Sequence, residues 1–218
     1  VTVTPVNDNL PVITSSATAS VPENTTAVLT VTATDADLPA QTLSYSIIGG
    51  ADASKFQIDA NTGALSFITA PDFEAPTDAG GNNIYDVTVQ VSDGAGGTAS
   101  QAITVTVTPV NDNLPVITSS ATASVPENTT AVLTVTATDA DLPAQTLSYS
   151  IIGGADASKF QIDANTGALS FITAPDFEAP TDAGGNNIYD VTVQVSDGAG
   201  GTASQAITVT VTPVNDNL

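Results

Sequence analysis

Acidic and amide side chains are the groups in this chain that could carry chemistry. Its 218 residues include 23 Asp or Glu, two Lys or Arg, and no His or Cys. Without His and Cys there is no Ser-His-Asp or Cys-His nucleophile system, no zinc finger and no disulfide. Carboxylate, amide and main-chain carbonyl oxygens are instead the ligands of hard cations, above all calcium. The composition therefore predicts binding of Ca2+; the catalysis that it still allows is that of a carboxylate pair, and our expectation is a protein that is not an enzyme.

Charge and hydropathy exclude further classes. A formal charge of -21 cannot neutralise phosphates, so neither nucleic-acid binding nor direct contact with an anionic membrane is expected. No apolar run approaches the roughly 18 residues of a membrane span. With 41% hydrophobic residues and a mean hydropathy of +0.18, the chain can bury a core and is not a disordered polyanion.

An internal repeat defines the organisation. The segment at residues 1–10 recurs at 105–114 and 209–218, and the sequence between recurs without a mismatch, which gives a period of 104 residues. That period is typical of an independent domain. We expect residues 1–10 to be the tail of a preceding repeat or linker. Residues 11–110 should form the first independently folded domain, called a bead below, and residues 111–218 a linker and the second bead. Identical beads must do the same job, and the overhangs suggest a segment of a longer array.

Each bead has the composition and periodicity of strands. Thr, Val and Ile are abundant, and apolar residues alternate with polar ones. The strands that this pattern predicts in the first bead lie at 12–16, 27–33, 43–48, 56–58, 64–68, 85–91 and 99–107. About seven strands in roughly 100 residues indicate an all-β fold, with a Greek-key β-sandwich of immunoglobulin type in each bead. The beads are thus tandem sandwiches joined by a short polar segment between Pro109 and Pro115.

Two acidic loops and the remaining charges have simpler interpretations. Residues 59–63 have the Asx and Gly chemistry of a hairpin turn. Residues 78–83 carry oxygen ligands on a Gly-containing loop, which is either a separate calcium site or a solvated loop. Outside the metal site each bead has a charge of −3, which favours solubility. It comes from four acids and one cation, namely Asp52, Asp59, Asp78, Asp86 and Lys55.

Five motifs in order resemble those of the cadherin family. Pro22-Glu23-Asn24 is similar to its P-E-N motif and Asp72-Phe73-Glu74 to its D-R-E motif. The linker from Pro109 to Pro115 is similar to D-x-N-D-N-x-P, Asp139-Ala140-Asp141 to D-x-D, and residues 189–197 to a late strand that ends in Asp. The resemblance covers the whole repeat and implies a calcium cluster at each junction.

Carried over residue by residue, the resemblance implies three sets of calcium ligands. The central junction would use Glu23, Asp72, Glu74, Asn111, Asp112, Asn113, Asp139, Asp141 and Asp197. One outer half-site would use Asn7, Asp8, Asn9, Asp35, Asp37 and Asp93, and the other Glu127, Asp176, Glu178, Asn215, Asp216 and Asn217. Pro109 replaces the first Asp of the family's linker, and residues 142–146 lack its usual Asn. Main-chain carbonyls of Asn111, Asn113 or Ala144 could fill these places.

Charge arithmetic supports the same junction. Seven of its ligands are carboxylates, and like charges at close range cost several kcal/mol unless cations neutralise them. We therefore expect a metal-free junction to loosen and a calcium-bound one to be stiff.

Near-identical cadherin-like repeats of this length resemble the extender repeats of giant bacterial RTX adhesins, including those of ice-binding adhesins of cold-water marine bacteria. The resemblance implies a calcium-rigidified spacer on the extracellular side of a bacterial cell surface, a monomeric rod whose partners are calcium ions and neighbouring repeats. Two alternatives stay open at this point. A calcium-dependent adhesion or polysaccharide-binding module would need an apolar or aromatic surface patch, and a two-carboxylate glycosidase would need a cleft.

Overall fold

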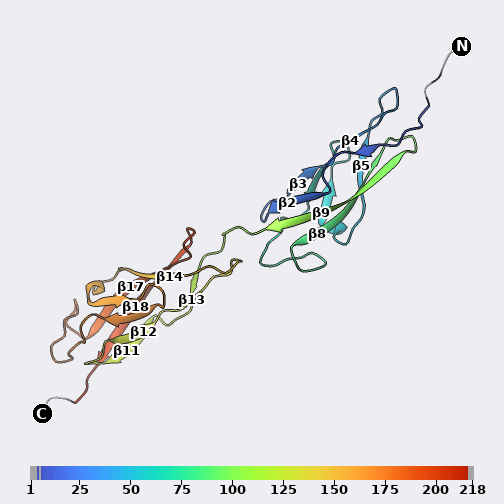
Figure 1. Ribbon diagram of the computed structural model, residues 1–218. Coiled ribbons are helices and arrows are strands. Elements are labelled where there is room, and N and C mark those ends of the chain that lie inside the picture. Colours follow the sequence, from blue (N-terminus) through green and yellow to red (C-terminus); the bar gives the residue numbers. More distant parts are fainter. Residues whose placement is uncertain (1–3, 5, 216–218) are drawn as a thin grey trace. The chain divides into compact units, whose positions relative to one another are not determined.

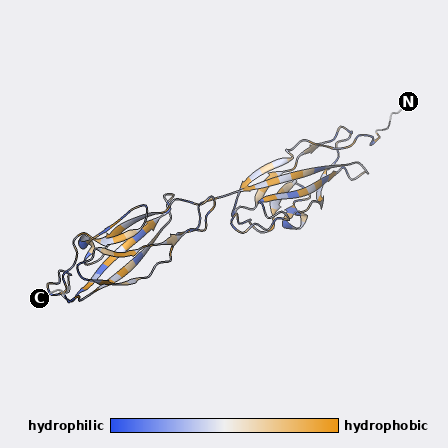
Figure 2. Ribbon diagram, turned by 60° about the horizontal axis from the view of Figure 1, so that its bottom comes forward, coloured by the Kyte–Doolittle hydropathy of each residue, from blue (hydrophilic) through white to orange (hydrophobic). Residues whose placement is uncertain are grey.

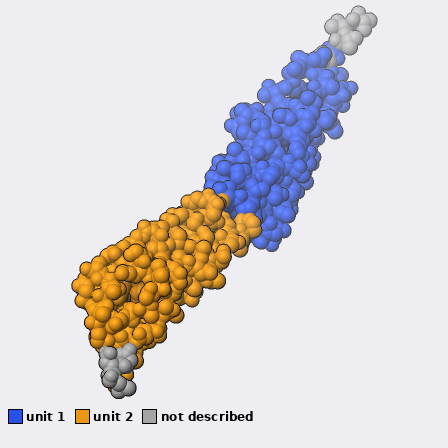
Figure 3. All heavy atoms as spheres, turned by 60° about the vertical axis from the view of Figure 1, so that its left-hand side comes forward, with its two compact units in different colours: residues 1–110 blue, residues 111–218 orange. Residues whose placement is uncertain are grey.

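The computed structural model describes residue 4 and residues 6–215. They fall into two compact units, Val1–Val110 and Asn111–Leu218, which Figure 3 distinguishes by colour. The repeats are identical in sequence, and the elements of the second unit correspond one by one to those of the first.

Short strands build each unit. The first contains β1 (Val12–Ile13), β2 (Thr18–Pro22), β3 (Ala27–Thr30), β4 (Ala33–Thr34), β5 (Ser44–Gly49), the 3-10 turn η1 (Ala53–Lys55), β6 (Phe56–Ile58), β7 (Ala64–Phe67), β8 (Ile84–Ser92) and β9 (Thr98–Thr108). The second contains β10 (Val116–Ile117), β11 (Thr122–Pro126), β12 (Ala131–Thr134), β13 (Ala137–Thr138), β14 (Ser148–Gly153), η2 (Ala157–Lys159), β15 (Phe160–Ile162), β16 (Ala168–Phe171), β17 (Ile188–Ser196) and β18 (Thr202–Thr212).

In each unit the strands form a four-stranded and a three-stranded sheet, whose buried faces build one core, and a separate two-stranded pair (Figure 1). In the first unit the larger sheet has the order β2-β9-β8-β5 and the smaller one β3-β7-β6, while β1 pairs with β4. The second unit has the equivalent sheets β11-β18-β17-β14 and β12-β16-β15, with β10 paired to β13. β2 runs parallel to β9, and the long β8–β9 hairpin is antiparallel from Ile84↔Thr106 to Ser92↔Thr98.

Alternation along the strands produces the core. Tyr85, Val87, Val89 and Val91 on β8 are buried, whereas the residues between them face outward or are half-buried. Figure 2 shows the same alternation as changing colours along the ribbons. The ring of Phe67 lies edge-on to that of Tyr85, with centroids 5.1 Å apart. Each such side chain contributes about 1.5–3 kcal/mol by burial.

The predicted fold class is confirmed, but the strand list needs three corrections. The strand expected at 12–16 is reduced to Val12–Ile13, and the one expected at 27–33 divides into β3 and β4. β2 was not predicted. It consists mainly of small residues and pairs in parallel with β9, about 86 residues away along the chain, so its stabilising partner leaves no local signal.

Within the described part of the chain, no helix is long and apolar enough to cross a membrane.

Candidate metal centres

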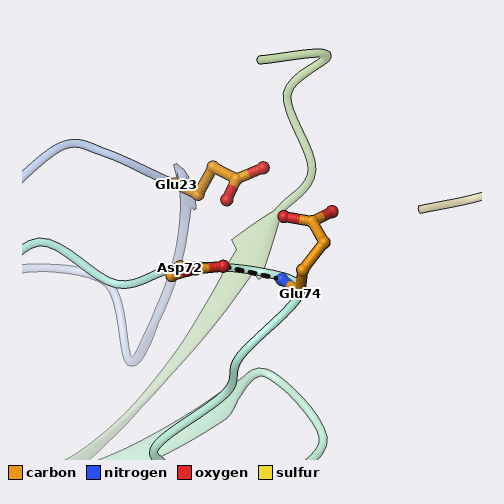
Figure 4. Close-up of side chains that lie close together, drawn as sticks. All are labelled: Glu23, Asp72 and Glu74. Carbon is orange, nitrogen blue, oxygen red and sulfur yellow. Dashed lines mark hydrogen bonds between the residues drawn. The ribbon is translucent and has the colours of Figure 1, made fainter. Parts of the chain in front are cut away.

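The first acidic cluster lies where β2 and β9 of the first unit end. Glu23 follows β2 directly, while Asp72 and Glu74 lie in the loop between β7 and β8. One carboxylate oxygen from each residue lies within 4.8 Å of the others, and Figure 4 shows the three side chains close together. The sequence motifs that predicted these ligands are thus brought to one place within a single unit.

Backbone hydrogen bonds fix the acids of this cluster. Glu23 is 2% exposed, and its Oε2 and Oε1 accept hydrogen bonds of 2.7 Å from the backbone N–H groups of Phe73 and Val110. Oδ1 of Asp72 accepts from the N–H of Glu74 at 3.0 Å, which forms a tight Asx turn. The two acidic segments and the start of the linker are therefore held together before any cation binds.

The second unit repeats this cluster at its own end. Glu127, Asp176 and Glu178 lie within the same 4.8 Å limit. Hydrogen bonds from the backbone N–H of Val214 and then of Phe177 hold the pKa of Glu127 below its ordinary value, although burial opposes them. The carboxylate is therefore ionised and available to a cation.

The remaining predicted ligands of that half-site follow Val214 along the chain. Asn215 is the last described residue. Asp216 and Asn217 lie outside the described residues.

A different cluster lies at the opposite end of the second unit. Asp139 and Asp141 follow β13, and Asp197 follows β17. Their carboxylate oxygens come within 4.8 Å of one another. Asp141 is 2% and Asp197 5% exposed, so the cluster is enclosed by protein rather than displayed on a loop face.

Amides of the linker are hydrogen-bonded to this cluster. Nδ2 of Asn111 donates to Oδ2 of Asp197 at 3.1 Å. Asn113 donates to Oδ1 of Asp141 through its side chain at 2.8 Å and its backbone N–H at 3.1 Å, and Nδ2 of Asn113 also donates to Oδ1 of Asp112 at 3.0 Å. The linker residues predicted as ligands therefore belong structurally to the unit that follows them.

Two buried carboxylate oxygens in this cluster have no hydrogen-bond partner among the described residues. They are Oδ2 of Asp139 and Oδ2 of Asp141. Burial opposes ionisation of Asp141 and the charge of Asp197 raises its pKa, but hydrogen bonds from Asn113 outweigh both, so the pKa of Asp141 lies below its ordinary value. A buried anionic oxygen without a donor is costly, and a cation is the group that satisfies it. The donor set therefore fits calcium.

The first unit carries the same predicted ligands before its own β-sandwich, but the carboxylate oxygens of Asp35, Asp37 and Asp93 do not form a group within the 4.8 Å limit that Asp139, Asp141 and Asp197 meet. Asn7 donates to Oδ2 of Asp93 at 3.2 Å, and Nδ2 of Asn9 donates to Oδ1 of Asp37 at 2.6 Å. The hydrogen bond from Asn9 is the main cause that holds the pKa of Asp37 below its ordinary value. The two other predicted ligands there also take part in this network, since the backbone N–H of Asp8 donates to Asp37 and Asp35 accepts from the backbone N–H of Asp37.

The long hairpin separates the two clusters within a unit. β9 has 11 residues, and a strand of that length spans about 36 Å at ~3.3 Å per residue. One cluster adjoins the end of β9 and the other adjoins the loop before it, so each unit carries an acidic half-site at each end of its long axis.

Comparison with known proteins identifies the repeat. The family model for the cadherin domain matches residues 17–108 and 121–212. The chain belongs to the cadherin domain family. Human protocadherin Fat 1 is 36% identical over 231 residues, covering 100% of this chain and 5% of the relative. Mouse cadherin-related family member 2 is 32% identical over 182 residues, covering 81% of this chain and 14% of the relative.

Solved cadherin structures share the fold. Mouse cadherin-23 EC22-24 matches with a TM-score of 0.67 and 28% identity, covering 97% of this chain and 67% of that chain. Human protocadherin-24 EC1-2 matches with a TM-score of 0.73 at 22% identity, covering 96% and 100%, and supports the fold alone. Cadherin domains are non-enzymatic extracellular modules that bind calcium in general and serve adhesion or structure. This chain spans a small part of its curated relatives.

Two acids of the cadherin domain that the sequence left outside the metal site are structural. Asp52 is 3% exposed, and its two oxygens accept from the backbone N–H groups of Ala79 and Asp86 at 2.7 and 2.9 Å. Asp78 is 7% exposed and accepts from the N–H groups of Asn82 and Asn83 at 3.0 and 2.9 Å. The loop at 78–83 is thus fixed by its own Asp, which supports a structural role rather than a separate calcium site.

Another group that sequence reasoning missed is a Gln in each cadherin domain. Nε2 of Gln41 donates to Oδ1 of Asn7 at 2.8 Å, and Gln145 donates to Oδ1 of Asn111 in the same way. The linker Asn is therefore held by an acid on one side and by an amide on the other. The only sequence signal was the recurrence of a Gln four residues after the second Asp of each D-x-D motif.

Proposed function

We propose that this chain is a calcium-rigidified spacer, in which calcium ions at each junction fix one cadherin domain relative to the next. Glu23, Asp72 and Glu74 would face the cluster of the next domain across the linker. The domains then act as a monomeric extended array whose contribution is length, with no chemical reaction to perform.

One observation carries this proposal: the unsatisfied, buried Oδ2 atoms of Asp139 and Asp141 beside Asp197. Solvated acids do not need a cation, but enclosed ones do. Calcium supplies the positive charge and the flexible oxygen coordination that such a cluster lacks. The acids supply most of the ligands, and the hydrogen-bonded amides of Asn111 and Asn113 hold those acids in place.

Consecutive linker residues support one junction rather than two separate half-sites. The backbone N–H of Val110 bonds to Glu23, and the side chain of the next residue, Asn111, bonds to Asp197. Neighbouring Cα atoms are about 3.8 Å apart. The chain therefore passes from one acidic half-site to the next without spare length, which favours ions shared by both.

The host we propose is a long bacterial surface adhesin that holds a distal binding domain away from the cell. Its support is the repeat itself, because two 104-residue copies without a mismatch suit a part selected for length rather than for divided recognition. Human protocadherin Fat 1 and mouse cadherin-related family member 2 are animal proteins, so they support the spacer function but not the bacterial host. Sequencing of the gene that surrounds the repeat tests it, and an animal cadherin host would overturn it.

Calcium titration by calorimetry on the 218-residue chain tests the metal site. We expect saturable binding in the range of about 0.1–1 mM. The double variant Asp139→Asn/Asp141→Asn should lose part of that binding, while Asp86→Asn, which changes an exposed acid, serves as the control. Unchanged binding in the double variant would contradict the assignment.

A second function, adhesion through a polysaccharide, is favoured by one feature. Each unit has an open pocket, of about 470 Å³ in the first and 540 Å³ in the second. The lining of the first pocket includes Lys55, the single cation of that unit, the carboxylate of Asp72, the hydroxyls of Ser54 and Thr69, and the apolar side chain of Ile68. Donors and acceptors next to an apolar face suit a sugar. Binding of the two-domain chain on a glycan array, lost in Lys55→Gln/Lys159→Gln, would establish this function.

A further inference from the structure

The Gln after each D-x-D motif has an amide oxygen that is buried and has no hydrogen-bond partner among the described residues. The atoms are Oε1 of Gln41 and Oε1 of Gln145. A buried amide oxygen without a donor is uncommon and costs free energy unless another group satisfies it. The feature occurs in both units, so it follows from the repeat rather than from one local arrangement.

The other half of the same amide group is engaged at the acidic cluster. In the first unit Nε2 of Gln41 donates to Asn7, which donates to Asp93. In the second unit Gln145 donates to Asn111, which donates to Asp197. Because Nε2 is the donor to the linker Asn, the oxygen without a partner belongs to the same amide group that holds the linker.

Other amides with an unsatisfied oxygen provide a contrast. Nδ2 of Asn83 donates to the backbone carbonyl of Phe73, and Nε2 of Gln101 donates to that of Ser15. Gln145 differs because it donates to a side chain, that of Asn111, and Asn111 in turn donates to the candidate ligand Asp197. The carboxylate of Asp197 lies within 4.8 Å of those of Asp139 and Asp141, and these two acids also have unsatisfied oxygens.

We propose that Gln145, and Gln41 in the first unit, supplies a side-chain oxygen ligand to the calcium ion held by the adjacent acids, while its Nε2 holds the linker Asn. This inference rests on the proposed calcium site and deepens it. A neutral amide oxygen is an ordinary calcium ligand, and it completes coordination without adding to the repulsion among the acids. Gln145 would also supply a ligand from residues 142–146, the segment that lacks the Asn that is usual in the family.

Terbium(III) luminescence lifetimes in H2O and D2O test this on the full chain, since they report the number of water molecules bound to the metal. We expect Gln145→Leu to add about one metal-bound water and to weaken calcium binding by about tenfold or more. Gln205→Leu is the matched control, because Gln205 has the same unsatisfied oxygen but donates to the backbone of Ser119. An unchanged water count in Gln145→Leu would overturn the inference.

A charged variant separates a ligand from a simple hydrogen-bond donor. Gln145→Glu removes the donor to Asn111 but supplies an anionic oxygen. If Gln145 is a ligand, Gln145→Glu should bind calcium more tightly than Gln205→Glu does, with no added metal-bound water. If Gln145 acts only as a hydrogen-bond donor, Gln145→Glu should bind calcium more weakly, and that result would overturn the inference. If the unsubstituted chain binds neither terbium nor calcium, the proposed function fails. If it binds both, and the Gln145 variants leave the affinity and the number of metal-bound waters unchanged, this inference alone fails.

Discussion

The backbone N–H of Val110 donates a hydrogen bond of 2.7 Å to the buried carboxylate of Glu23. A residue at the start of one domain thereby controls the direction in which the chain leaves it, about 87 residues later. The other oxygen of Glu23 is bonded to Phe73, beside Asp72 and Glu74. One side chain therefore connects the linker to the acidic loop of the metal site.

Glu23→Gln should release the start of the linker. The amide that replaces the carboxylate has one acceptor oxygen and cannot accept from both Val110 and Phe73. We expect faster hydrogen exchange at the Val110 amide and a lower melting temperature of the first unit. Glu74→Gln is the control, because it removes the charge of a candidate ligand without changing either bond of Glu23. Equal exchange at Val110 in the Glu23 variant and the unsubstituted chain would contradict this role.

Asp112→Ala and Glu74→Ala should loosen the junction without unfolding the sandwiches. Both residues lie outside the hydrophobic cores, so the change should reach calcium binding and interdomain mobility rather than core packing. We expect unchanged circular dichroism together with weaker calcium binding and faster independent tumbling of the units by NMR relaxation. Unfolding of either sandwich would show instead that these acids serve the interior of their own unit.

Asp78 and its equivalent Asp182 should make stability depend on acid pH. Burial opposes their ionisation, yet hydrogen bonds from backbone N–H groups, such as Asn82 and Asn83 to Asp78, outweigh it and lower the pKa of each below 3.8. A lowered folded-state pKa gives stability that is complete above the ordinary value and is lost as the pH falls through the lowered one. We therefore expect this contribution to disappear below about pH 4.

The double variant Asp78→Asn/Asp182→Asn isolates that contribution. At neutral pH in EDTA it should lower the free energy of unfolding by about 1–3 kcal/mol per unit, because one of the two backbone N–H donors loses its acceptor and the other keeps only a neutral one. The difference from the unsubstituted chain should shrink as the pH falls below 4. Asp86→Asn, at an exposed position, is the control. A difference that is independent of pH would show that shape rather than charge matters at Asp78.

Calcium should stabilise the chain by mass action. A ligand present at about 100 times its dissociation constant stabilises the bound form by about 2.7 kcal/mol for one site. We expect the melting temperature to rise with calcium concentration and to fall after EDTA is added, whereas sodium chloride at the same ionic strength should not reproduce the rise. A melting temperature that ignores calcium would contradict a bound cation.

The sequence predicted the alternating strands well because their signal is local. Phe56–Ile58 has the predicted bounds, and β5 differs from the expected strand by one residue at each end. β2 was missed because its partner lies far along the chain, and because Pro22 reads as a strand breaker although it only ends an edge strand. Long-range pairing is what single-sequence patterns do not contain.

The acids show the same division between local and distant causes. The resemblance to the cadherin motifs indicated which acids gather, and the structure brings Asp72 and Glu74 close to Glu23, and Asp139 and Asp141 close to Asp197; their role as metal ligands stays a prediction. It did not predict the burial of Asp52 and Asp78, since these carboxylates are satisfied by backbone N–H groups that the sequence does not display. The Gln ligand was missed for the same reason, as its role depends on Asn111, 34 residues earlier.

Small-angle X-ray scattering of the 218-residue chain, first in calcium and then in excess EDTA, tests the central claim most directly. We expect a well-defined maximum dimension with calcium, a broadened distance distribution after EDTA, and recovery when calcium is restored, while circular dichroism shows both sandwiches folded throughout. A maximum dimension that stays the same in calcium and in EDTA, together with an unchanged melting temperature, would contradict it.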